Sequence, residues 1–166
     1  MLTTIMKQLE YPLTATSFSQ SECNAIMKFV LEAGLSCSGI VRTIPRPLVY
    51  GPIKYQGLGI HDLYVTQGIL HLQEMVEHGY RGSDSTGKLI RTSAEHLLLE
   101  LGTPEALFEH AYKKYHSLAT RCWLKSTWEF VSKADIQLTT TLPTLKTSCP
   151  GDIFLIPAFQ RYTKPL

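Results

Sequence analysis

The sequence has no apolar run long enough to cross a bilayer, no Cys-x-x-Cys pair and little net charge. Crossing a bilayer requires about 20 consecutive apolar residues, so we expect no transmembrane segment and no membrane partner. The four cysteines lie far apart, and residues 1–11 lack the long apolar stretch of a secretion signal. We therefore expect reduced thiols in an intracellular protein, either cytoplasmic or nuclear.

Composition places the chain among ordinary globular proteins. Hydrophobic residues make up 44% of the 166 residues and charged residues 18%, which differs from the composition of disordered chains. A chain of this length can bury about two-thirds of the surface that it exposes when unfolded, so we expect a single module over residues 1–166. The net charge of +2 does not require a polyanionic partner, although a local basic face can exist within it.

Apolar residues recur at helical spacing along most of the chain and predict about five helices. The expected helices cover residues 19–33, 62–78, 85–101, about 104–115 and about 120–131. Ser19 and Glu22 have the spacing of a capping box, and Asp62 is a suitable N-cap. Residues 1–10 look like the tail of a further helix, which suggests that the module is a fragment of a longer polyprotein. Trp123 and Trp128 mark a major packing face of the last helix.

Two regions depart from the helical pattern. Residues 35–60 contain three prolines and four glycines, and therefore predict an extended, turn-rich connection. Residues 136–140 alternate in polarity and residues 153–156 are apolar, which predicts one or two short strands near the C-terminus. The sequence thus predicts a mainly α fold with a Pro/Gly-rich connection within it.

The connection carries the candidate binding residues. Arg42, Arg46 and Lys54 alternate with Tyr50 and Tyr55, and such a segment can follow a phosphate backbone, because cations neutralise phosphates and aromatic rings stack on bases. The alternative interpretation is a packed loop whose tyrosines cover the core and whose cations are solvated. We name Arg42, Arg46, Lys54 and Tyr55 as candidate nucleic-acid-binding residues.

Other motifs do not support catalysis. Gly82–Lys88 has the spacing of a phosphate-binding loop, but Leu89 follows it in place of Ser or Thr, and a helix precedes it where a strand is required. We interpret it as a polar turn with Asp84 or Ser85 as the helix cap. His71 and His78 lie two helical turns apart, about 10 Å, too far to share a zinc ion without further ligands. Cys23 and Cys122 are expected to be small core residues. We assign no catalytic residue, no metal, no cofactor and no small-molecule substrate.

The order of several short motifs resembles the region that follows the polymerase core in reverse transcriptases of eukaryotic retroelements. The N-terminal motifs are Tyr11-Pro-Leu-Thr-Ala-Thr, Ile44-Pro-Arg46, Val49-Tyr-Gly-Pro52, Tyr55-Gln-Gly-Leu-Gly59, Leu63-Tyr64 and Gln67-Gly68. Thr86-Gly-Lys-Leu-Ile-Arg91, Leu99-Glu-Leu-Gly102 and Cys122-Trp-Leu-Lys-Ser-Thr-Trp128 continue the similarity, which covers about residues 9–135. No single motif is specific; their order carries the resemblance.

The resemblance also indicates what the chain lacks. Reverse transcriptases of this kind hold two magnesium ions on palm aspartates, whereas this sequence contains no Asp-Asp pair. It therefore resembles a thumb or connection segment without its palm, and we expect no enzymatic activity on its own, although the parent would be an RNA-directed DNA polymerase. The expected partners are nucleic acid or the missing palm domain. The alternative is a freestanding helical protein-protein interaction domain.

Overall fold

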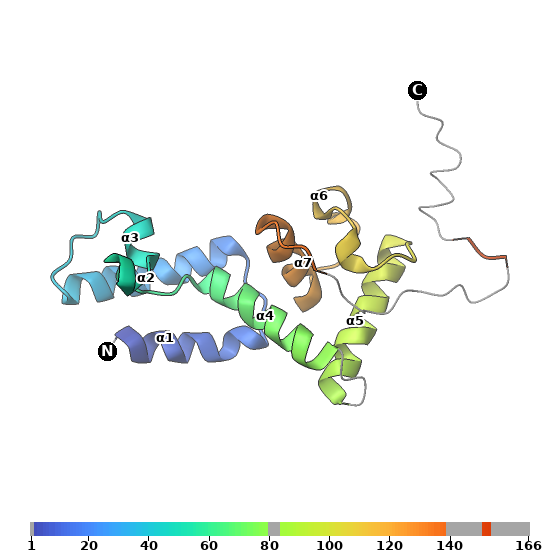
Figure 1. The fold of residues 1–166 in the computed structure, drawn as a ribbon, viewed down its shortest axis with the longest axis horizontal. Coiled ribbons are helices and arrows are strands. Elements are labelled where there is room, and N and C mark those ends of the chain that lie inside the picture. Colours follow the sequence, from blue (N-terminus) through green and yellow to red (C-terminus); the bar gives the residue numbers. More distant parts are fainter. Residues whose placement is uncertain (1, 80–83, 139–150, 154–166) are drawn as a thin grey trace, which may run out of the picture. The chain divides into compact units, whose positions relative to one another are not determined.

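The computed structural model describes residues 2–79, 84–138 and 151–153, and every regular element in these ranges is helical (Figure 1). The predicted mainly α fold is therefore confirmed. The α-helices are α1 (Leu2–Glu10), α2 (Gln20–Cys37), α3 (Arg46–Tyr50), α4 (Leu63–Gly79), α5 (Ser85–Leu101), α6 (Tyr112–Tyr115) and α7 (Trp123–Lys133). Three 3-10 helices accompany them: η1 (Tyr11–Thr14), η2 (Ile53–Tyr55) and η3 (Leu107–Glu109).

The predicted C-terminal strands lie mostly outside the described residues. Residues 136–138 have no regular secondary structure, and residues 139–140 and 154–156 belong to the part that is not described. No described helix combines the length and apolar character that crossing a bilayer requires. Whereas the length predicted a single module, the chain divides into two compact units, Met1–His71 and Leu72–Leu166.

Local capping explains where the long helices begin. The Ser19 hydroxyl accepts a hydrogen bond from the Glu22 amide at 3.3 Å, and the Glu22 carboxylate accepts one from the Ser19 amide at 2.6 Å. The Asp62 carboxylate accepts the amides of Tyr64 and Val65 at the start of α4. The Asp84 carboxylate accepts the Gly87 amide at 2.6 Å at the start of α5, as the polar-turn interpretation predicted. These contacts satisfy amides that have no partner within the first helical turn.

Helix ends were predicted less well than helix starts. Gly34 does not end α2, which continues to Cys37, because Leu35 extends the buried face of Leu31 by one turn. Gly102 does end α5 in the left-handed conformation, with a φ of 65° and its amide bonded to the Leu98 carbonyl. A glycine at that position carries no steric penalty.

The core of the first unit combines apolar side chains with two buried polar ones from α4. The Gln67 side chain accepts a hydrogen bond from the Phe18 amide and donates one to the Phe18 carbonyl, both at 2.9 Å. One turn later, His71 Nε2 donates to the carbonyls of Leu13 (3.0 Å) and Thr16 (2.9 Å). The buried apolar residues of this unit are Met6, Leu13, Cys23, Met27, Leu31, Leu35, Val49, Ile60, Leu63 and Tyr64.

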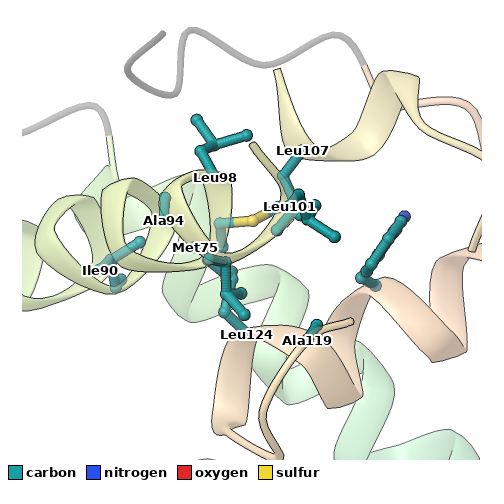
Figure 2. Close-up of a cluster of buried hydrophobic side chains, with 10 residues drawn as sticks. Met75, Ile90, Ala94, Leu98, Leu101, Leu107, Ala119 and Leu124 are labelled. Atoms are coloured by element: carbon teal, nitrogen blue, oxygen red, sulfur yellow. The ribbon is translucent and has the colours of Figure 1, made fainter. Parts of the chain in front are cut away.

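The core of the second unit joins the end of α4 to α5 and α7. Its buried members are Met75, Ile90, Ala94, Leu97, Leu98, Leu101, Leu107, Ala119, Leu124 and Trp128. Figure 2 shows the side chains of Met75, Leu101 and Leu107 meeting beside α5. Ile69, Val76 and Leu89 are apolar residues of α4 and α5 that are exposed.

The helix predicted at about 104–115 is wrong as a continuous element. The chain forms η3 and α6 there, separated by His110 and Ala111 in extended conformations. The His110 carbonyl accepts the Trp128 indole N–H at 3.1 Å, so it takes no part in a helical ladder. The last helix begins at Trp123, after the predicted start near 120, and Cys122 caps it through a 3.4 Å contact from the Lys125 amide to Sγ. Cys122 is thus a cap that is partly buried and packs against the edge of the core.

The two tryptophans should differ in their contribution to stability. Trp128 is 1% exposed within the core, whereas Trp123 is only partly buried against it. We expect Trp128→Ala to lower the free energy of unfolding by about 3 to 5 kcal/mol, the range for a buried large aromatic side chain. Trp123→Ala should lower the free energy of unfolding by clearly less. Urea titrations of both variants and the wild-type chain measure these losses. Equal losses for the two variants would contradict the packing described above.

His71 should make the first unit sensitive to acid. Burial lowers the pKa of His71 below its ordinary value of 6.5, against the opposing effect of its hydrogen bonds to the Thr16 and Leu13 carbonyls. The unfolded chain therefore binds the proton more readily, so stability is fully present above about pH 6.5 and falls as the pH decreases below it.

The measurement is urea unfolding at pH 7.5 and 5.5, followed by helical circular dichroism. His71→Gln keeps a donor but does not titrate, so it should reduce the loss of stability between the two pH values. His96→Gln, which changes an exposed histidine of α5, is the matched control. The account fails if His96→Gln flattens the pH dependence and His71→Gln does not.

Candidate nucleic-acid interface

The Pro/Gly-rich connection folds into a closed loop. Its first residues, 35–37, belong to α2, and α3 and η2 form within it. Pro47 is compatible with α3 because it lies in the first turn, where no amide is required. Three backbone hydrogen bonds close the loop: Leu58 to Leu48 (2.8 Å), Gly59 to Gly51 (2.9 Å) and Ile60 to Val49 (3.2 Å).

Glycine is required where the two sides of this loop meet. A Cβ atom at Gly57 would lie 2.1 Å from the Gly51 carbonyl oxygen, so no larger residue fits without moving the backbone. Gln56, immediately before it, adopts a left-handed φ of 62°. The close approach of Gly51 and Gly57 leaves Ile53, Lys54 and Tyr55 at the exposed tip of the loop.

All four predicted site residues lie at the surface. Lys54 and Tyr55 are adjacent at the loop tip, with the Lys54 ammonium 5.7 Å from the centre of the Tyr55 ring, which is 72% exposed. Arg46 is exposed at the first position of α3. Arg42 is also exposed, and its Nε donates to the Ser36 hydroxyl at 3.1 Å. The structure thus brings Lys54 and Tyr55 together, while Arg42 contacts the end of α2.

All formally charged residues of the segment are cations. No Asp or Glu occurs between Glu32 and Asp62, so Arg42, Arg46 and Lys54 have no carboxylate neighbour along the chain. In the described part of the chain, no ion pair joins any of the three to a carboxylate. Cations that are not paired with carboxylates are available to phosphates, and salt weakens this attraction.

The two tyrosines of the segment behave differently. Tyr50 is partly buried, and burial together with the nearby Asp62 charge raises its pKa, while Arg46 acts in the opposite direction. It therefore covers the core, as the packed-loop alternative predicted for both tyrosines. Tyr55 does not cover the core, and its exposed ring face is available to a ligand.

A cavity in the same unit was missed from the sequence. Its volume is about 180 Å³, and it is lined by Met6, Lys7, Glu10, Leu58, Gly59, Ile60 and His61. The Glu10 carboxylate lies 2.7 Å from His61 Nδ1 at this cavity. Glu10 and His61 are 51 positions apart, so no local pattern could join them. The lining includes no Ser, Cys or Thr nucleophile.

The remaining motifs have structural roles in the described residues. Asp84 caps α5 and also accepts a hydrogen bond from His78 Nδ1 at 2.7 Å, a contact that raises the pKa of His78. Residues 82 and 83 of the phosphate-loop-like motif lie outside the described part. Burial raises the pKa of the Cys23 thiol to about 11, as expected for an inert core residue. Within residues 2–79, 84–138 and 151–153, no three His, Cys, Asp or Glu side chains gather as metal ligands would.

No protein-family model matches this chain, and neither the curated proteins nor the solved structures yield a significant match. The resemblance to retroelement reverse transcriptases therefore stays a prediction that depends on the order of the motifs.

Proposed function

We propose that the chain is a non-catalytic, thumb-like or connection-like segment of a retroelement reverse transcriptase, and that it contacts the backbone of a nucleic-acid duplex. Arg42, Arg46 and Lys54 bind phosphates, and Tyr55 packs against the sugar-phosphate chain beside Lys54. The observation that supports this most directly is that all three cations are exposed in a segment without a carboxylate.

The loop geometry supports the same function. Closure of the loop by backbone hydrogen bonds restricts the backbone that carries Lys54 and Tyr55, so little backbone entropy is lost when they meet a ligand. Phosphate contacts of this kind position a protein on a duplex without reading its sequence. Such contacts suit a segment whose parent polymerase must move along any template.

Apolar side chains in the same segment favour a second candidate, the freestanding protein-protein interaction domain. Val41, Leu48 and Ile53 are exposed, at 69%, 46% and 76% respectively. An interface centred on them would use the cations only at its rim, where charges contribute little affinity. This candidate predicts no duplex binding at low salt.

A salt titration separates the two candidates. For the wild-type chain and a primer-template duplex, the logarithm of the affinity should fall linearly with the logarithm of the salt concentration. The slope should be about −0.9 for each phosphate contact. Arg46→Ala and Lys54→Ala should each remove one phosphate contact and so reduce the magnitude of that slope by about 1. Lys28→Ala, which removes an exposed cation of α2 outside the segment, is the matched control and should leave the slope unchanged.

Two results would contradict the proposal. One is the absence of duplex binding at 50 mM salt. The other is equal binding by wild type and by the Arg46→Ala/Lys54→Ala double variant. Either result would favour the interaction-domain candidate.

A further inference from the structure

The second unit contains its own positive segment. Between His110 and Glu129 the chain has four cations and no Asp or Glu: Lys113, Lys114, Arg121 and Lys125. The net charge of the whole chain is only +2, so these cations are locally concentrated. The same stretch includes Tyr112, Tyr115, His116, Trp123 and Trp128. Cations interleaved with aromatic rings are typical of surfaces that bind single-stranded nucleic acid.

Three of these rings form a column that leads from the core to the surface. Trp128 is buried at its base and is fixed by the indole N–H donated to the His110 carbonyl. The Tyr112 ring meets Trp128 edge-on, with centroids 5.0 Å apart and an interplanar angle of 86°. The His116 ring stacks on Tyr112 at 5.2 Å and 28°. We refer to Trp128, Tyr112 and His116 as the aromatic column.

Hydrogen bonds hold the outer rings of the column in place. The Tyr112 hydroxyl donates to the Glu129 carboxylate at 3.1 Å, and His116 Nδ1 donates to the Tyr112 carbonyl at 3.2 Å. His116 is nevertheless exposed, and within the described residues Tyr112 is the aromatic ring stacked on it. The outermost ring of the column is therefore pre-oriented by Tyr112 and largely exposed.

Two lysines of α6 lie between Tyr112 and His116 in the sequence. Lys113 and Lys114 are exposed, and the Lys114 ammonium lies 5.0 Å from the centre of the Tyr115 ring. In the described ranges neither lysine pairs with a carboxylate. Both ammonium groups are thus available to anions, two and three residues before the stacking ring in the chain.

We propose that this surface binds single-stranded nucleic acid, with an unpaired base stacked on the open face of His116 and neighbouring phosphates bound by Lys113 and Lys114. A duplex keeps its bases stacked on one another, so it offers no base to His116, and an acidic peptide without aromatic residues, such as polyglutamate, offers no flat ring. The site lies in the second unit and uses none of the residues assigned to duplex binding.

The test measures the affinity of the full chain for a fluorescent 12-nucleotide oligo-uridine by anisotropy over a range of salt concentrations. His116→Ala should weaken binding at least about fivefold, since stacking contributes about 1 to 3 kcal/mol per base, and should leave the salt slope unchanged. His116→Phe should retain the affinity. Lys113→Ala and Lys114→Ala should each reduce the slope by about 0.7, the value for a single-strand phosphate contact.

The controls separate this site from the duplex interface. In the Arg46→Ala/Lys54→Ala background, His116→Ala should weaken oligo-uridine binding as much as it does in the wild-type chain. This result is expected even if the chain does not bind duplex at all. Circular dichroism establishes that each variant is folded. The proposal is overturned if folded His116→Ala binds like wild type, if His116→Phe fails to restore a lost affinity, or if polyglutamate competes as well as oligo-uridine.

Discussion

The first unit depends on two polar side chains that α4 buries against the backbone between α1 and α2. Gln67 pairs with both the amide and the carbonyl of Phe18, and His71 donates to Leu13 and Thr16. Buried backbone groups without partners are costly, about 1 to 3 kcal/mol each, so these side chains make the path of residues 13–18 possible. Phe18 directly precedes the cap of α2, and the pairing therefore fixes where α2 begins relative to α4.

The closed loop carries the candidate interface on this frame. Its backbone hydrogen bonds run from Leu48, Val49 and Gly51 to residues 58–60, just before α4. Val49 is completely buried, so the loop is attached to the core on one side and exposes its cations on the other. The aromatic column is built in a similar way, with buried Trp128 at its base and exposed His116 at its end. In both places a rigid internal contact orients a surface group that could bind an anionic polymer.

Local signals explain how much of this fold the sequence could predict. The starts of α2, α4 and α5 were predicted because Ser19, Asp62 and Asp84 cap their own helices within three residues. The break between η3 and α6 was missed because it depends on Trp128, 18 residues after the carbonyl that it contacts. The different burial of Trp123 and Trp128 is equally invisible to helical periodicity.

For the candidate site residues too, features that depend on neighbours in the sequence could be predicted, and features that depend on distant contacts could not. The absence of Asp and Glu next to Arg42 and Lys54 along the chain can be read from the sequence, but the exposure of these two side chains cannot. His71 was considered only as a metal ligand, and Gln67 only as part of a family motif, because their partners lie 49 to 58 positions away. A search for runs without acidic residues would have found the segment after His110, although not the stacking of His116 on Tyr112.

The central claim is that the chain binds nucleic acid through two separate surfaces, one on each unit. A ¹H–¹⁵N NMR titration of the full chain tests it residue by residue. We expect duplex to shift the amide signals of residues 42–55, and single-stranded oligo-uridine to shift those of residues 112–116, with little overlap between the two sets. Shifts that are absent with both ligands, or that fall outside both segments, would contradict the account.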